Sequence, residues 1–171
     1  MYRTAISIVL LSLLFGLIGY GQINYSIKIE TGFLKYRYNT IRVDPGPNWK
    51  GYYLNGENGI DLNFINGLYY KKKLFAGIGL GYLNFEGIGG LSLFSDFEYL
   101  PLKSKLSPLI NLKIGYSHIW NQYENGTGTA LSELTIGLNY RMTEKIDMYI
   151  KSGFLLTQQS SLIPIRLGFR F

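Results

Sequence analysis

A strict alternation of apolar and polar residues constrains this chain more than any other feature of its sequence. Successive side chains of a β-strand point to opposite faces, so a period of two indicates a strand, whereas a helix repeats every 3.6 residues. The alternation is clearest in the last segment, where bulky apolar residues share one face, and arginines, glycine and proline share the other. The first face holds Ile163, Ile165, Leu167, Phe169 and Phe171, and the second holds Pro164, Arg166, Gly168 and Arg170. The pattern predicts an all-β protein.

Eight segments with this rhythm can be drawn, and their lengths fit a tilted membrane strand of about 9–11 residues with a few residues projecting beyond it. They lie at about 25–36, 57–70, 74–86, 91–102, 108–120, 130–142, 146–157 and 162–171. Short charged turns at 71–73, 103–107 and 143–145 alternate with polar loops at 37–56, 87–90, 121–129 and 158–161. Short turns on one side and longer loops on the other are typical of outer-membrane barrels. The even number of strands places both termini on the short-turn, periplasmic side.

Residues 1–22 have the features of a secretory signal peptide. Arg3 supplies the positive start, 5–18 is apolar, and small residues precede Gln22, where we expect cleavage. A permanent helical anchor needs about 20 apolar residues, more than this run provides. We therefore expect residues 1–22 to be removed and residues 23–171 to form one domain. No later apolar run is long enough for a transmembrane helix, so the mature chain can span a membrane only as a barrel.

Composition narrows the class of protein. The 171 residues suggest a single domain, and with no cysteine the fold has no disulfides to stabilise it. The net charge is +6, but the cations are not gathered into a stripe interleaved with aromatic residues, so we expect no nucleic-acid partner. One histidine and no cysteine also leave no metal-binding cluster, and no cofactor is expected. Six cations instead cluster in the three short turns, where all of them are lysines: Lys71, Lys72, Lys73, Lys103, Lys105 and Lys145.

Alternation alone does not say which face is buried. The apolar face carries more large side chains than the interior of an eight-stranded barrel can hold, because that interior is only wide enough for side chains to fill it. Glycines recur on the polar face, where in a narrow lumen they leave room for long neighbours: Gly32, Gly77, Gly79, Gly81, Gly115, Gly137, Gly153 and Gly168. We therefore expect the apolar face to contact lipid. A soluble periplasmic barrel that binds a ligand in an apolar interior is the alternative.

Aromatic residues sit near both ends of the apolar face, where their rings can lie in lipid and their polar tips among headgroups. The expected periplasmic girdle is Tyr25, Tyr70, Tyr99, Tyr140 and Phe169, and the expected outer girdle is Phe33, Tyr82, Tyr116, Trp120 and Phe154. The sequence thus predicts an eight-stranded antiparallel up-and-down transmembrane β-barrel after an N-terminal signal peptide.

At this level the chain resembles the small eight-stranded outer-membrane barrels of the OmpA-transmembrane and OmpX type, and the outer-membrane β-barrel domain proteins of Bacteroidota. The strand rhythm over the whole mature chain and the terminal residues 165–171 carry the resemblance. It implies a location in the cell outer membrane. It also implies that Leu167, Phe169 and Phe171 form the signal that the barrel-assembly machinery reads.

The polar face carries six cations and six acids, and balanced charges imply pairing, because an unpaired buried charge is very costly. The cations are Lys28, Lys113, Arg141, Lys151, Arg166 and Arg170, and the acids are Glu30, Asp61, Asp96, Glu98, Glu133 and Asp147. Tight hairpins would pair Asp96 with Lys113 and Arg141 with Asp147, and barrel closure would pair Glu30 with Arg166. With Tyr69, Phe75 and Tyr149 also inside, we expect a closed lumen in a monomer.

Three outward features suggest functions. If the hairpin at 121–129 is regular, His118 faces Ser132 on the outer face, and the pair resembles the base and nucleophile of a lipid A deacylase. Lys35 and Arg37 lie above Phe33 and could bind lipopolysaccharide phosphates. The loop 37–56 contains exposed aromatic residues suited to an extracellular partner. The leading hypothesis is a non-enzymatic barrel with a structural, adhesive or partner-binding role, and the deacylase-like enzyme is the alternative.

Overall fold

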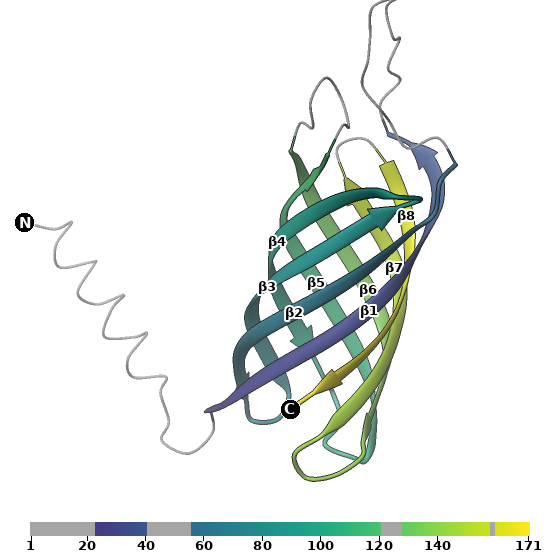
Figure 1. The fold of residues 1–171 in the computed structure, drawn as a ribbon. Coiled ribbons are helices and arrows are strands. Elements are labelled where there is room, and N and C mark those ends of the chain that lie inside the picture. Colours follow the sequence, from purple (N-terminus) through teal and green to yellow (C-terminus); the bar gives the residue numbers. More distant parts are fainter. Residues whose placement is uncertain (1–22, 41–55, 121–127, 158–159) are drawn as a thin grey trace, which may run out of the picture.

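A computed structural model describes residues 23–40, 56–120, 128–157 and 160–171, which form eight antiparallel strands closed into one barrel (Figure 1). The strands are β1 (Ile23–Asn39), β2 (Gly59–Tyr70), β3 (Leu74–Phe85), β4 (Ile88–Tyr99), β5 (Leu106–Ile119), β6 (Thr129–Arg141), β7 (Asp147–Thr157) and β8 (Ser160–Arg170). The eight-stranded antiparallel prediction is confirmed. Among the described residues, no helix is long and apolar enough to cross a membrane.

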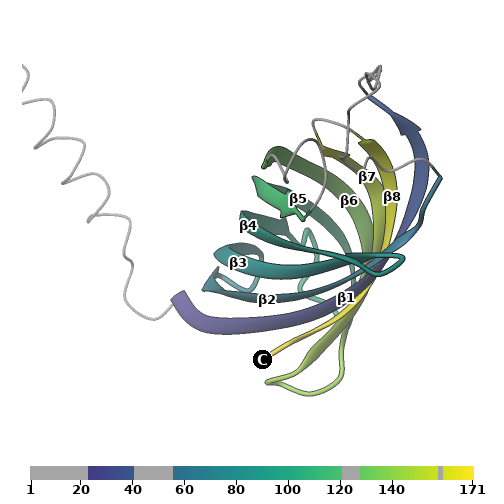
Figure 2. The same ribbon diagram turned by 45° about the horizontal axis from the view of Figure 1, so that its top comes forward.

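Each strand pairs with the next in sequence, and β8 closes the barrel by pairing with β1 (Figures 1 and 2). The last residue takes part in the closure. The backbone nitrogen of Phe171 donates to the carbonyl of Ile27 at 2.8 Å, and the nitrogen of Ile27 donates to the carbonyl of Phe171 at 3.1 Å. Ser26 Oγ donates to the same carbonyl at 2.9 Å. The C-terminal residue is therefore held in the ladder rather than left beyond it.

Several of the expected connections have different bounds in the structure, because β5 begins at Leu106, β6 at Thr129 and β8 at Ser160. The expected loop at 87–90 is a tight turn whose central residues, Glu86 and Gly87, have φ of 50° and 99°. Positive φ at both central positions is typical of the hairpin turn that fits the right-handed twist of the strands. The first strand also continues to Asn39, so the expected loop 37–56 begins as strand.

Several expectations fall on residues outside the described ranges. These are the signal peptide at 1–22, most of the first loop at 41–55, most of the third at 121–127, and 158–159. They remain predictions.

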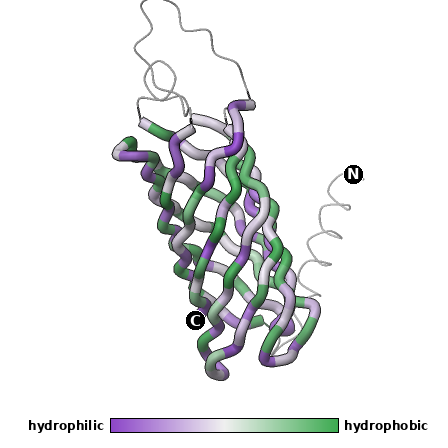
Figure 3. The backbone as a smooth tube through the Cα atoms, turned by 90° about the vertical axis from the view of Figure 1, so that its right-hand side faces the viewer, coloured by the Kyte–Doolittle hydropathy of each residue, from purple (hydrophilic) through white to green (hydrophobic). Residues whose placement is uncertain are grey.

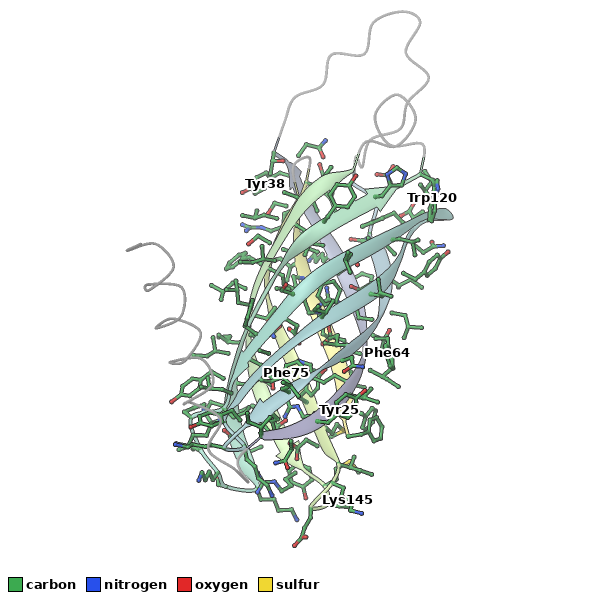
Figure 4. The ribbon with its side chains drawn as sticks, turned by 90° about the vertical axis from the view of Figure 1, so that its left-hand side faces the viewer. Tyr25, Tyr38, Phe64, Phe75, Trp120 and Lys145 are labelled. Carbon is green, nitrogen blue, oxygen red and sulfur yellow. The ribbon has the colours of Figure 1, made fainter. Side chains whose placement is uncertain are left out.

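The apolar face points outward on every strand, and hydropathy alternates along each one (Figure 3). Nine of the ten expected girdle aromatics have exposed side chains, and Tyr70 is half-buried. Tyr25 lies towards the lower end of the barrel and Trp120 at the upper end (Figure 4). This distribution is the opposite of a soluble barrel with an apolar ligand cavity, and it fits a barrel surrounded by lipid.

The interior holds two kinds of side chain. Charged and polar residues occupy the middle and the periplasmic end, as the alternation predicted. The outer end is closed instead by a buried apolar cluster: Leu34, Leu83, Phe85, Ile119, Leu131, Leu155 and Leu162. Sequence reasoning missed this cluster, because near the outer ends large apolar residues also occupy the inward face, among small polar residues such as Ser117, Thr129 and Ser160.

Candidate functional site

The main polar site is a chain of ion pairs that begins at the periplasmic mouth of the lumen. Arg141 Nε lies 3.7 Å from Asp147 Oδ1, and Arg170 Nη1 lies 3.1 Å from Asp147 Oδ2. Arg170 also pairs with Glu98, whose other oxygen accepts from Lys28 Nζ at 3.0 Å. Only Arg141 keeps substantial exposure, so the chain leads from the half-buried mouth into a fully buried interior.

At the centre of the lumen, side chains from other strands converge on the carboxylate of Glu30. Its carboxylate pairs with Lys113 from β5 and, at 2.9 Å, with Lys151 from β7. Tyr149 donates its hydroxyl to the same carboxylate at 3.0 Å. Lys151 also donates to Asn111 Oδ1 at 2.8 Å, so this centre is tied to β5 a second time. Every polar atom of the Glu30 carboxylate therefore has a charged or hydroxyl partner.

A third group lies above the centre and is built on Arg166. Its Nε and Nη2 donate to the two oxygens of Glu133 at 2.8 and 2.6 Å, which is a bidentate pair. Its Nη1 pairs with Asp61, which also accepts from Asn63 Nδ2 at 3.1 Å. A Cβ atom at Gly32 would overlap both Asp61 and Arg166, so this lumen glycine leaves room for the pair.

All twelve predicted lumen charges point inward, but two of the three predicted pairings are wrong. The register places Asp96 opposite Lys113 as expected, yet Asp96 pairs with Lys28 and Lys113 pairs with Glu30. Glu30 does not meet Arg166, because Gly168 is its partner across the β1–β8 seam. Long side chains in a narrow lumen reach across to other strands rather than only to the neighbour opposite. Arg141 and Asp147 do lie together.

Aromatic rings fill the space between these ions. Phe75, Tyr149 and Tyr69 are buried inside the barrel, as expected. Lys28 Nζ lies 4.3 Å from the ring centroid of Phe75, and Lys113 Nζ lies 4.6 Å from that of Phe94, both within the range of cation–π attraction. Ion pairs and rings together fill the middle of the barrel, so the network can hold the strands together.

The expected His118–Ser132 pair is not assembled. Ser132 lies opposite Ile114, not opposite His118, and the two side chains are four residues apart along the ladder. That spacing corresponds to roughly 13 Å, which is far beyond hydrogen-bond reach. His118 instead contacts Trp120, with ring centroids 5.8 Å apart and an interplanar angle of 83°. The regular-hairpin assumption failed because Ser117 pairs with Thr129, so the β5–β6 connection is four residues shorter than a pairing of His118 with Ser132 requires.

Lys35 and Arg37, the two candidate lipopolysaccharide contacts, lie at the outer end of β1, and both side chains are exposed. The guanidinium of Arg37 lies 5.4 Å from the ring centroid of Phe154 and 5.5 Å from that of Tyr38. These rings hold Arg37 at the level of the outer girdle, near Lys35. Within the described residues, no group of three His, Cys, Asp or Glu side chains could hold a metal ion.

The predicted assembly residues lie on the outward face of the last strand. Leu167, Phe169 and Phe171 are all exposed towards the expected lipid phase. The fold places them beside β1, where the barrel closes.

Comparison with known proteins supports the fold. No family model matches the chain, and no curated protein matches its sequence. The chain is similar to neisserial surface protein A, with a TM-score of 0.62 and 10% identity over 86% of this chain and 97% of that one. It is also similar to the N-terminal β-barrel domain of Pseudomonas aeruginosa OprF, with a TM-score of 0.56 and 14% identity over 88% and 100% of the two chains. With its apolar exterior and charged lumen, the chain has the fold of the small eight-stranded outer-membrane β-barrels.

Proposed function

We propose that this protein is a non-enzymatic, monomeric outer-membrane barrel that acts through its outer surface, in a structural, adhesive or partner-binding role. The filled lumen is the observation that supports this most directly. Lys28 and Asp96 are completely buried there, and Tyr149 is 1% exposed, so side chains fill the middle of the described barrel, above the hollow at its lower mouth. The surfaces left for partners are the lipid-facing wall and the two ends.

The outer end is the better candidate of the two ends for extracellular contacts. Its connections include 41–55, whose sequence contains Trp49, Tyr52 and Tyr53. Large aromatic side chains on a rigid scaffold are frequent at protein–protein hot spots. The ion network and the apolar cluster provide such a scaffold immediately below.

Replacing 41–55 with a glycine–serine linker of equal length tests this proposal. Cells that express the protein are expected to adhere to protein-coated surfaces more strongly than cells that lack it, and the replacement is expected to abolish that difference. Heat-modified migration in gels checks that the barrel is intact in the outer-membrane fraction. Unchanged adhesion, or ion conductance of the purified protein in planar bilayers, would contradict the proposal.

We also propose that Lys35 and Arg37 bind lipopolysaccharide phosphates. Arginine binds phosphate in a bidentate manner, and the rings of Phe154 and Tyr38 hold Arg37 at the outer girdle. Substituting both cations with glutamine is expected to reduce co-purified lipopolysaccharide. Lys72→Gln combined with Lys145→Gln is the control, because it removes the same two charges at the opposite end of the barrel, where Lys145 lies (Figure 4). Equal losses in the two variants would count against specific contacts.

A further inference from the structure

The lipid-facing wall has a hollow where β2, β3, β4 and β5 approach their periplasmic turns. It has a volume of about 600 Å³ and a largely apolar lining. Ala76 forms the floor, because this small residue lies between its larger ladder partners, Leu68 on β2 and Phe97 on β4. Tyr70 and Tyr99 line the end nearest the turns. We call this hollow the Ala76 groove.

The groove continues up the wall. A second hollow of about 500 Å³ shares Ala76 and is bounded by Phe64, Ile78 and Leu80. Phe64 points outward from the barrel and Phe75 into it, so this part of the wall separates lipid from the packed lumen (Figure 4). The two hollows together form an apolar track along the wall, a shape suited to a flexible hydrocarbon chain.

An exposed lysine lies at the lower end of the groove. Lys71 Nζ lies 5.0 Å from the ring centroid of Tyr70, which lines the groove. Within the described residues, the side chain of Lys71 forms no ion pair. The lysines of the β4–β5 turn lie farther round the barrel, where Lys105 Nζ is 5.1 Å from the ring centroid of Tyr140 on β6.

The β2–β3 turn holds its lysines in a disfavoured backbone conformation. Lys71 and Lys72 have φ of 53° and 54°, and the turn is closed by a bond of 3.0 Å from the nitrogen of Lys73 to the carbonyl of Tyr70. Turns of this kind prefer asparagine and glycine, since a Cβ atom is crowded at positive φ. Such outliers gather at functional sites, and of these two lysines Lys71 is the one beside Tyr70 and the groove.

We propose that the Ala76 groove and Lys71 beside it bind one anionic phospholipid of the periplasmic leaflet. An acyl chain lies over Ala76, and the phosphate meets Lys71 next to Tyr70. Tyr70 and Tyr99 lie at the boundary between chain and headgroup, which is where tyrosine is favoured in membranes. A lysine next to a membrane surface favours anionic headgroups. This site is independent of any adhesive role of the outer loops.

Native mass spectrometry tests the proposal on protein extracted from outer membranes and exchanged into detergent with equimolar phosphatidylglycerol and phosphatidylcholine of identical acyl chains. The protein is expected to retain one phosphatidylglycerol in preference to phosphatidylcholine. Lys71→Gln is expected to lower that preference about fivefold, the contribution of one lysine near an anionic surface. Ala76→Leu fills the groove and is expected to reduce retention of both lipids.

Two matched variants serve as controls. Lys72→Gln removes the same charge from the same turn, but the Lys72 side chain lines the lumen mouth beside Asp147 and Arg170. Ala130→Leu enlarges an exposed alanine on β6, away from the groove. Equal retention of the two lipids by the unmodified protein would overturn the proposal. So would equal effects of each variant and its control, or a two-chain complex that Ala76→Leu abolishes, since the groove would then be a dimer contact.

Discussion

Replacing Arg166 with methionine would remove the central cation of the upper ion group while keeping a side chain of similar length. Arg166 is 3% exposed, and its bidentate partner Glu133 is fully buried. Asp61 would keep its bond from Asn63, but it too would lose its charged partner. The variant would therefore leave two buried carboxylates without a neutralising guanidinium.

The expected loss of stability follows from this geometry. Removing one partner of a buried ion pair costs about 3–5 kcal/mol, because the remaining charge stays desolvated. Arg166 makes a bidentate pair and a second ion pair, so we expect a loss of about 4 kcal/mol, or roughly a thousandfold in the folding equilibrium. Urea unfolding of the purified barrel in detergent micelles, followed by heat-modified gel migration, measures the change.

Two further variants make the test specific. Arg141→Met removes a cation that is 26% exposed and lies 3.7 Å from Asp147, and a pair of this kind contributes about 1 kcal/mol or less. Adding Asp61→Asn and Glu133→Gln to Arg166→Met neutralises both acids and is expected to restore most of the lost stability. If Arg166→Met were no more destabilising than Arg141→Met, water would be screening the lumen charges and the reasoning would be refuted.

Three other outcomes are expected. Gly137→Ala should destabilise the barrel by about 1–3 kcal/mol, because the added Cβ would lie 2.0 Å from the backbone carbonyl oxygen of Ile150. Gly89→Ala is the control, because the nearest atom to its added Cβ is 3.5 Å away. Similar unfolding midpoints for the two variants would contradict the argument. Deleting Phe171 should lower the amount of heat-modifiable barrel in the outer membrane, because the residue adds two backbone bonds to the closing seam and is the last residue of the proposed assembly signal. Undiminished assembly would argue against both roles. His118→Ala should leave the acylation pattern of lipid A unchanged in mass spectra. A changed pattern would support the alternative hypothesis of a deacylase-like enzyme.

The sequence predicted the barrel because its signal is local and repeated. Each strand sorts its own side chains by a period of two, so a residue such as Ile165 or Arg166 can be assigned a face without knowing its neighbours in space. The glycines of the polar face were interpretable for the same reason. Gly168 lies against the Tyr149 ring, where a larger residue would clash.

Pairing across the lumen was less predictable. A hairpin register follows from a tight turn, and Arg141 with Asp147 was found in this way. The partner of Glu30 depends instead on which side chains reach the same height from β5 and β7, and strand tilt and shear around the closed barrel decide that. The distance between His118 and Ser132 depended on a connection whose length the local pattern does not define.

By itself the sequence determined the strand number, the inward charges and the outward apolar wall, because these follow from alternation along single segments. Only the tertiary structure decided which ions pair, that an apolar cluster closes the outer end, and that Ala76 leaves a groove between larger neighbours. These features depend on the heights at which side chains from separate strands meet, and closure of the barrel sets those heights.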